Sequence, residues 1–468
     1  MSFASIDFLI FFIIILSVTA AIERCFPTRV KECFLLFASY FFYGYWDWRF
    51  CFLLLFMTVT SYFAAKYSHH KAVFCLGIIT PLAVLVFFKY FNFFLNSVAS
   101  VMHKDLGVLN IILPVGISFY TFQALSYVID VRRGKLPVEK DFVRLALYIS
   151  FFPQLVAGPI VRASDFLPQL RENRKVSSKN IELGIQVFAF GLFKKIVLAD
   201  HISVFVDDVF SKPAAFHWST VILAVISYSI QIYLDFSGYS DMAIGCAKCL
   251  GYDFNKNFNL PYISQSVTEF WRRWHISLSS WLKEYLYIPL GGNKKGKLRQ
   301  YVNLSLTMLL GGLWHGANWT FVFWGGINGL ALCFDKLCKE IFHHEKPDTG
   351  IMRVIKIITT YVFISFTWIF FRSDSFGHAW TIIKGIFTLQ NGIRQPFAWS
   401  FVGIAFVVIA TVIAEIRSKS KEHASETNGF YPVLDLDGIP GLTIFFIEIG
   451  LILCLAYTGD NPFVYFQF

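Results

Sequence analysis

Long apolar segments alternate with short polar connections along most of the chain. A helix needs about 20 mostly apolar residues to cross a bilayer, so this pattern predicts an all-α polytopic membrane protein with roughly eleven transmembrane helices. The predicted spans lie near residues 3–22, 33–45, 50–66, 72–95, 110–129, 142–157, 181–199, 217–236, 300–334 (one bent helix or two short ones), 353–372, 399–415 and 440–458. Segments near 239–251 and 378–389 are too short or too polar to cross alone. Without an internal repeat or a linker, we expect one domain over 1–468.

The stretch between the spans at 217–236 and 300–334 has a different pattern. Residues 252–262 are too polar to cross a membrane, and Ser266 to Leu286 read as one amphipathic helix. Its predicted buried face follows i, i+3, i+4 spacing and comprises Trp271, Trp274, His275, Leu278, Trp281, Leu282 and Tyr285. A helix this rich in Trp and basic residues is typical of a membrane surface or a cavity wall.

Composition and charge support the membrane assignment and suggest an orientation. Hydrophobic residues make up 56% of the chain and charged residues 15%, against about 25% charged residues in soluble domains. The net charge of +10 comes mainly from short loops, with no basic-aromatic module for nucleic acid. Three such loops contain Arg24, Arg29 and Lys31; Lys66 and Lys71; and Arg132, Arg133 and Lys135. The positive-inside rule places these loops in the cytoplasm and the N-terminus outside.

Two histidines are the strongest candidates for chemistry. His315 lies in an apolar stretch that has no Asp, Glu, Lys or Arg between Arg299 and Asp335. An ionisable side chain at membrane depth costs free energy unless it is paired or hydrated, which makes it a functional-site candidate. His275 lies forty positions earlier on the Trp-rich face. Imidazole can accept and return a proton near neutral pH, so the pair suggests general-base catalysis in a hydrated cavity.

Glycines near His315 favour such a site. Gly312-x-x-x-Gly316 and Gly325-x-x-x-Gly329 permit close helix approach, and we expect Gly311-Gly312 to break the helix. Neither a GxSxG elbow nor a mechanistically placed Cys appears, so direct transfer of an activated acyl group to a hydroxyl is the simplest scheme. The alternative is a buried histidine that hydrogen-bonds a carbonyl and holds two helices together.

Other polar residues have two interpretations each. Asp235 and Asp241 either line the cavity or, as we favour, cap a short following helix. Arg272, Arg273 and Lys283 bind the phosphates of a carrier such as coenzyme A or anchor to lipid headgroups.

A metal site is not expected from the sequence. No HExxH or similarly spaced cluster appears. The single CxxC, Cys246 to Cys249, has no second pair, and His343-His344 lie in a charged loop typical of a solvated turn.

Several ordered motifs resemble the membrane-bound O-acyltransferase family, most closely its bacterial alginate O-acetylation branch. They are Trp271-Arg272-Arg273-Trp274-His275-Ile276-Ser277-Leu278-Ser279, Tyr287-Ile288-Pro289-Leu290-Gly291-Gly292 and Gly311-Gly312-Leu313-Trp314-His315-Gly316. Supporting stretches are Phe152-Pro153-Gln154 with Gly158-Pro159, Asp235 to Asp241, Asn257-Phe258-Asn259 with Pro261-Tyr262, and the aromatic ending Phe463 to Phe468.

The resemblance implies a fold, a reaction and roles. It implies a ring of helices around a central cavity where a cytoplasmic donor meets an extracytoplasmic acceptor. His315 matches the family's catalytic histidine, and His275 the second active-site position. The implied reaction transfers an acetyl group from acetyl-CoA, with no permanently bound cofactor, toward an exported polysaccharide such as alginate, often through a periplasmic SGNH-type partner. A sister branch handles D-alanyl groups for teichoic acids.

Two other classes of function fit a polytopic membrane chain. A polysaccharide transporter or channel also has polar residues at depth, usually with repeat symmetry and charges on several helices. A scaffold that recruits periplasmic enzymes predicts that partner binding survives loss of both histidines.

Overall fold

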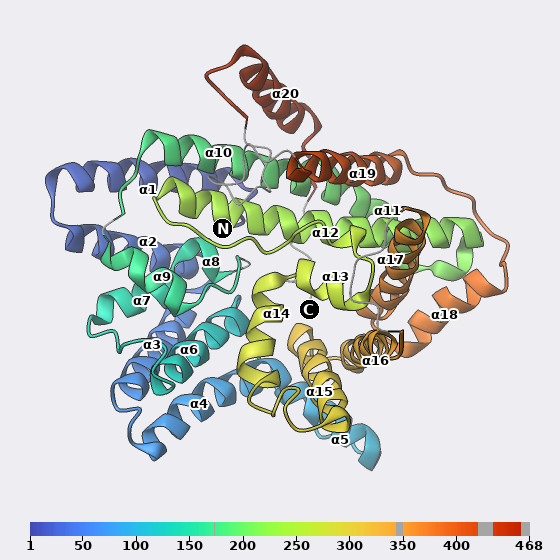
Figure 1. Cartoon of the computed structure of the whole chain (residues 1–468), viewed down its shortest axis with the longest axis horizontal. Helices are drawn as coiled ribbons and strands as arrows, with labels where there is room; N and C mark the ends of the chain where they lie inside the picture. Colours follow the sequence, from blue (N-terminus) through green and yellow to red (C-terminus); the bar gives the residue numbers. More distant parts are fainter. Residues whose placement is uncertain (157, 173, 343–349, 420–433, 460–468) are drawn as a thin grey trace. The chain divides into compact units, whose positions relative to one another are not determined.

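The computed structural model describes residues 1–156, 158–172, 174–342, 350–419 and 434–459 (Figure 1). Over this part of the chain the regular structure is helical, and the one β-type pairing is an isolated parallel bridge between Phe216 and Ile393. The helices form two compact units, which are described separately below. The all-α class predicted from the sequence is therefore confirmed, and the single-domain assignment stays a prediction.

Unit 1 contains residues 1–189 and 239–255. Its helices are α1 (Ile6–Cys25), α2 (Thr28–Asp47), α3 (Arg49–Lys66), α4 (Lys71–Leu85) with a π-helical turn at Val86–Tyr90, α5 (Phe91–Met102), α6 (Ile117–Arg132), α7 (Phe142–Ser150), α8 (Phe152–Leu155), α9 (Ala163–Arg171) and most of α10 (Ser178–Leu192). Phenylalanines interlock at its centre: the Phe42 ring lies 5.9 Å from Phe8 and 5.7 Å from Phe152.

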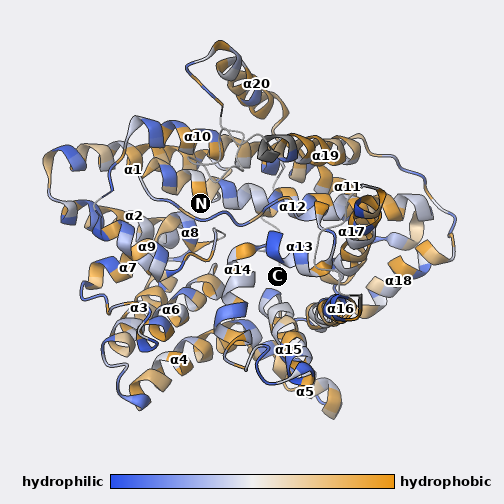
Figure 2. Ribbon diagram, in the orientation of Figure 1, coloured by the Kyte–Doolittle hydropathy of each residue, from blue (hydrophilic) through white to orange (hydrophobic). Residues whose placement is uncertain are grey.

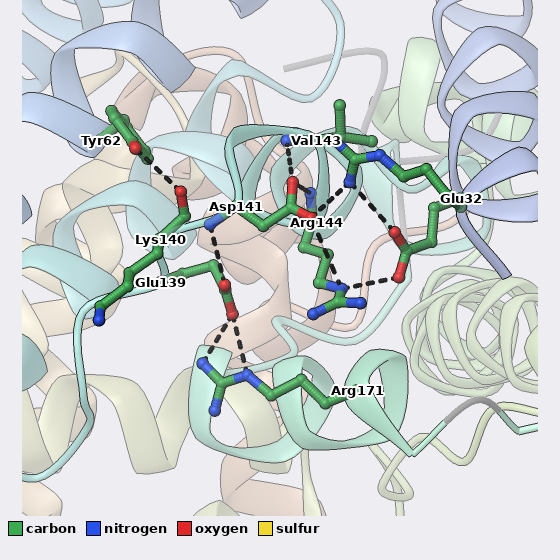
Figure 3. A network of polar contacts seen from close by, with 9 residues as sticks. Glu32, Tyr62, Glu139, Lys140, Asp141, Val143, Arg144 and Arg171 are labelled. Atoms are coloured by element: carbon green, nitrogen blue, oxygen red, sulfur yellow. Dashed lines mark hydrogen bonds and ion pairs between the residues drawn. The ribbon is translucent and has the colours of Figure 1, made fainter.

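Charged side chains of unit 1 pair at one end of its helices (Figure 3). The buried Glu32 carboxylate accepts from Arg144 Nε at 2.7 Å, and Glu139 accepts from Arg171 at 2.6 Å. Asp141 pairs with Arg29 and caps α7 by accepting from the Val143 amide at 2.9 Å. This network joins the start of α2 to the loop before α7.

The three basic loops of unit 1 meet at this same end. Arg29, from the first loop, pairs with Asp141, which follows the third loop. Arg132, from the third loop, donates to the carbonyls of Ser68 and His69 in the second loop, at 2.9 and 3.3 Å. The loops assigned to one side of the membrane by their charge therefore lie together.

Unit 2 contains residues 190–238 and 256–468. Its helices are a π-helical segment at Phe193–Ala199 that continues α10, α11 (Asp200–Ser211), most of α12 (Trp218–Cys249), α13 (Val267–Arg273), α14 (Ile276–Leu282) with a π-helical turn at Lys283–Tyr287, α15 (Lys297–His315), α16 (Trp319–Phe342), α17 (Gly350–Arg372), α18 (Phe376–Phe387), α19 (Ala398–Lys419) and α20 (Ile439–Leu455). Short 3₁₀ turns lie at Pro213–Ala215 and Pro261–Ile263.

Seven helices within the described residues are long and apolar enough to cross a membrane. They are Ile6–Cys25, Arg49–Lys66, Lys71–Met102, Trp218–Cys249, Trp319–Ile341, Gly350–Arg372 and Ala398–Glu415. Figure 2 shows α19 as mostly hydrophobic, in contrast to the hydrophilic residues of α13. This is an integral membrane protein.

Three segments singled out in the sequence take the following form in the structure. Segment 142–157 folds as α7 and α8, each too short to cross a bilayer alone. Segment 239–251 forms no separate element, because most of it belongs to the 32-residue helix α12. Segment 300–334 is two helices, α15 and α16, as one of the two sequence alternatives stated.

Helices α15 and α16 pack unusually closely because glycines face each other. A Cβ added at Gly312 would lie 2.3 Å from the Phe321 carbonyl oxygen and 3.1 Å from Gly325 Cα. A Cβ at Gly325 would lie 2.2 Å from the Met308 carbonyl oxygen. Small residues at a helix interface allow this backbone approach, so the glycine prediction is confirmed for Gly312 and Gly325.

Candidate functional site

His275 lies at a break between two short helices. The structure divides the predicted helix Ser266 to Leu286 into α13 and α14, and His275 between them has a left-handed backbone with φ of 44°. The prediction of one continuous helix is therefore wrong. The predicted apolar face is nevertheless buried at Trp274, Leu278, Trp281, Leu282 and Tyr285.

Hydrogen bonds from the polar loop before α13 explain the break. The Asn257 carbonyl accepts from the Ile276 amide at 2.8 Å, and the Asn259 amide donates to the Arg273 carbonyl at 2.8 Å. These bonds satisfy backbone groups that a helix end leaves open. The loop thus pairs with the Ile276 amide and the Arg273 carbonyl, which a continuous helix would pair within itself.

His315 is the last residue of α15. Gly316 continues in an extended conformation, and Asn318 begins α16 by accepting from the Thr320 amide at 3.0 Å. The expected break at Gly311-Gly312 is wrong, because α15 runs unbroken through both glycines. Their small size serves close packing of the helix.

The structure brings the two histidines together within unit 2. Their ring centroids lie 6.5 Å apart with an angle of 59° between the planes. The Trp314 ring contacts both imidazoles, at 6.0 Å from His275 and 5.1 Å from His315. The spacing is small enough for both imidazoles to contact one reacting group.

Aromatic side chains enclose the pair. Phe236 of α12 meets the His275 ring edge-on at 4.7 Å, and His315 makes edge contacts with Trp324 at 5.2 Å and Phe371 at 5.3 Å. Sequence reasoning missed these three residues, because each lies in an apolar helix where any aromatic fits the pattern.

Both imidazoles are buried: His275 has no exposed surface, and His315 is 4% exposed. Burial penalises the charged imidazolium and lowers the pKa of His275 to about 3. His275 is therefore neutral at physiological pH, with one nitrogen that donates and one that accepts.

Asp235 takes part in a buried charge cluster of unit 2. The Lys195 ammonium lies 2.6 Å from Asp235 and 2.8 Å from Asp200, all three side chains being buried. Next to them, Lys194 donates to Ser237 at 2.9 Å. Because α12 is continuous from Trp218 to Cys249, it has no N-terminus near Asp235 or Asp241. The capping interpretation is therefore wrong.

The three basic residues considered for carrier binding differ in their surroundings. Arg273 is engaged with the Glu269 carboxylate at 2.8 Å and donates to the Asn259 carbonyl at 3.1 Å. Arg272 and Lys283 are exposed. The latter two therefore have side chains accessible to a charged group.

Among the residues the structure describes, no group of three His, Cys, Asp or Glu side chains has a geometry that could hold a metal ion. The predicted turn at His343-His344 and the aromatic ending Phe463 to Phe468 lie outside the described residues.

Comparison with known proteins gives this site a context. A model of the MBOAT, membrane-bound O-acyltransferase family matches residues 136–373, which include both histidines. The chain is 34% identical to the probable alginate O-acetylase AlgI of Azotobacter vinelandii, over 94% of this chain and 95% of that protein. The chain belongs to the membrane-bound O-acyltransferase family. It is accordingly an integral-membrane O-acyltransferase, and the resemblance seen in the sequence motifs is confirmed.

Other members of the membrane-bound O-acyltransferase family match over shorter stretches. The peptidoglycan O-acetyltransferase of Helicobacter pylori is 37% identical over 77% of this chain and 74% of its own length. The teichoic acid D-alanyltransferase of Bacillus subtilis is 27% identical over 58% of this chain and 71% of its own. The relatives thus share acyl transfer but differ in the acceptor polymer and the acyl group.

Proposed function

We propose that this chain takes an acetyl group from acetyl-CoA and transfers it outward for O-acetylation of an exported polysaccharide. The observation that carries the proposal is the buried pair His275 and His315, 6.5 Å apart in an aromatic enclosure. Family membership supports the reaction class, and the extensive match to the alginate O-acetylase supports acetyl as the group and alginate as the first acceptor to test.

In the proposed reaction, His315 is the general base. Its imidazole removes the proton from an acceptor hydroxyl as the oxygen attacks the thioester carbonyl. The new ester bond forms, the carbon–sulfur bond breaks, and the proton passes to the leaving thiolate, giving the O-acetyl product and free coenzyme A. A positioned base contributes about 10²–10⁴-fold in rate. No acyl-enzyme is needed.

His275 is the second proposed catalytic residue, which orients the donor or relays the proton. Its low pKa keeps the ring neutral, as required for a group that accepts a hydrogen bond or a proton. For the phosphates of coenzyme A, we propose the exposed Arg272 and Lys283. Arg273, being bound to Glu269, holds α13 and its loop together.

We place the protein in the bacterial inner membrane with its N-terminus outward. Support comes from unit 1, where all three basic loops meet at one end, since basic short loops are retained in the cytoplasm. The donor then reaches the site from the cytoplasm, and a periplasmic SGNH-type protein completes transfer to the polymer. Labelling of Cys25 or Cys33, both exposed near the first basic loop, from one side of sealed vesicles tests this orientation.

The runner-up acceptor is peptidoglycan, because the Helicobacter pylori relative is named for that reaction. Transfer of D-alanyl groups to teichoic acid ranks lower, since that relative matches a smaller share of the chain at lower identity.

Purified protein in vesicles, given radiolabelled acetyl-CoA, tests the function. The assay includes alginate and other candidate glycans. Label should move to one of these glycans with stoichiometric release of free thiol, and adding a periplasmic partner should increase the yield. D-alanyl transfer from a carrier without acetyl transfer would favour the teichoic acid reaction instead. Glycan transport without any acyl transfer would contradict the proposal and favour the transporter.

A further inference from the structure

The side chain of Asn257 is fixed by a backbone group that can only donate. Asn257 is buried, and its Oδ1 lies 3.2 Å from the Ser277 amide nitrogen. A backbone N–H always donates, so the amide atom that faces it must be the oxygen. The hydroxyl of Ser277 donates to the same Oδ1 at 2.9 Å. The orientation of the Asn257 amide is therefore determined by its neighbours.

The same oxygen faces His275. Oδ1 of Asn257 lies 3.2 Å from His275 Nδ1. An amide oxygen has no proton to give, so a hydrogen bond here requires the proton to be on Nδ1. The Ser277 hydroxyl leads to the same conclusion: it lies 3.5 Å from Nδ1, and with its own proton given to Asn257 it can only accept from the imidazole.

We propose that Asn257 is a positioning residue that holds His275 in the Nδ1–H tautomer, so that Nε2 is the nitrogen that accepts a hydrogen bond or proton during acyl transfer. The hydrogen bond that one ring nitrogen makes sets the state of the other. This inference rests on the proposed function for its catalytic consequence, although the tautomer itself can be measured without activity.

Asn257 also holds the backbone that carries the ring. Its main-chain carbonyl accepts from the Ile276 amide at 2.8 Å, directly after the left-handed His275. One residue thus fixes both the backbone and the imidazole of His275. Phe236, edge-on at 4.7 Å, packs against the same ring. Rotation of the imidazole would cost the Asn257 hydrogen bond and disturb this packing.

The arrangement has a chemical consequence. When Nε2 takes up a proton, the ring becomes an imidazolium whose Nδ1–H still donates to the Asn257 oxygen. A neutral amide stabilises that cation less than a carboxylate would. His275 therefore accepts a proton transiently and returns it readily, as a relay between hydroxyl and leaving thiolate requires.

The first test is a spectrum of the wild-type protein. Nitrogen-15 labelling of histidine, with the His275 signals identified by their loss in His275→Asn, distinguishes protonated from unprotonated ring nitrogens. Near neutral pH we expect a protonated Nδ1 and an unprotonated Nε2. An Nε2–H tautomer, or a fully protonated ring, would overturn the inference.

Two variants at Asn257 test the consequence for catalysis. Asn257→Leu removes the acceptor at similar volume, so the Nδ1–H preference should be lost. We expect kcat to fall by about 10–100-fold, the cost typical of losing a residue that orients a metal-bound imidazole. Asn257→Asp keeps an acceptor, so the Nδ1–H signal should persist. Its pH–rate profile should move to higher pH, because the carboxylate stabilises the imidazolium.

Asn259→Leu is the matched control, since Asn259 bonds to Arg273 through its backbone. It should keep the wild-type tautomer and rate. Wild-type rate and tautomer in Asn257→Leu would contradict the inference; if that variant does not fold, the wild-type spectrum and Asn257→Asp decide it. A wild-type protein that transfers no acetyl group would overturn the proposed function, while its His275 spectrum would still decide the tautomer.

Discussion

The polar network of unit 1 and the histidine site of unit 2 use ionisable residues in opposite ways. In unit 1, Arg144 and Arg171 are partly exposed and pair with the buried carboxylates of Glu32 and Glu139 (Figure 3). In unit 2, His275 and His315 are buried among aromatic rings. The first arrangement joins loops, and the second places two imidazoles beside each other, His275 in its neutral form. Our proposal therefore places the chemistry at the buried pair of rings and not where charged side chains are most numerous.

The largest expected effect comes from two substitutions at His275, which distinguish the role of the imidazole from that of the left-handed backbone. At φ of 44°, Asn is tolerated, whereas a β-branched residue is strained. His275→Asn should fold and lose about 10²–10⁴-fold of the transfer rate. His275→Val should in addition lose about 1–3 kcal/mol of stability. Rates and thermal unfolding in detergent check both, and full activity in a folded His275→Asn would contradict a role for the imidazole.

Buried and surface ion pairs should differ in energy. Lys195→Met leaves two buried carboxylates, Asp235 and Asp200, without their shared cation, which should cost about 3–5 kcal/mol. Arg49→Met in unit 1 removes the exposed partner of Asp47 and should leave the stability nearly unchanged, because solvent screens the pair. Equal shifts of the unfolding midpoint in these two variants would break the contrast between the units.

Near His315, adding a methyl group should disturb the packing of α15 against α16 at Gly325 but not at the adjacent Gly326. A Cβ at Gly325 would meet the Met308 carbonyl at 2.2 Å, whereas at Gly326 it would meet only the end of Leu309 at 3.3 Å. Gly325→Ala should lose about 1–3 kcal/mol through overpacking and lower the transfer rate by moving α15. Gly326→Ala is the control and should stay near wild type. Similar unfolding curves for both would show that close packing is unimportant.

The smallest expected effect is on pH dependence. Burial lowers the pKa of His275 to about 3, below the value of about 6.5 in an unfolded chain. The unfolded state therefore gains a proton first as the pH falls below about 6.5. Wild type should lose stability relative to His275→Asn, by about 1 kcal/mol at pH 5.5. A stability difference that stays constant between pH 7 and pH 5.5 would contradict a neutral buried ring.

The sequence predicted much of this site from local patterns. The apolar face with Trp274 and Trp281 is buried as expected, and the apolar stretch around His315 forms closely packed helices. Periodicity could not reveal the break at His275, because a face spaced i, i+3, i+4 looks the same whether one helix or two in tandem carry it. The hydrogen bonds of Asn257, 18 residues earlier, decide the break.

Two other errors have a similar origin. The sequence predicts that Asp235 caps a helix, but the structure pairs it with Lys195. That lysine lies 40 positions away in another apolar segment, so local patterns could not reveal the ion pair. The sequence predicts a break of α15 at Gly311-Gly312. In the structure the helix continues, and Gly312 faces Gly325 of α16. Long-range contacts, which local patterns do not encode, set the outcome in each case.

The central claim is that a buried imidazole at His315 acts as the base for acyl transfer. Its most direct test is thiol release from acetyl-CoA that depends on an added glycan, measured with purified wild type, His315→Ala and the exposed control His69→Ala. Wild type and His69→Ala should give equal rates, and a folded His315→Ala should be slower by about 10²–10⁴-fold. Glycan-dependent release at the wild-type rate in His315→Ala would contradict the account.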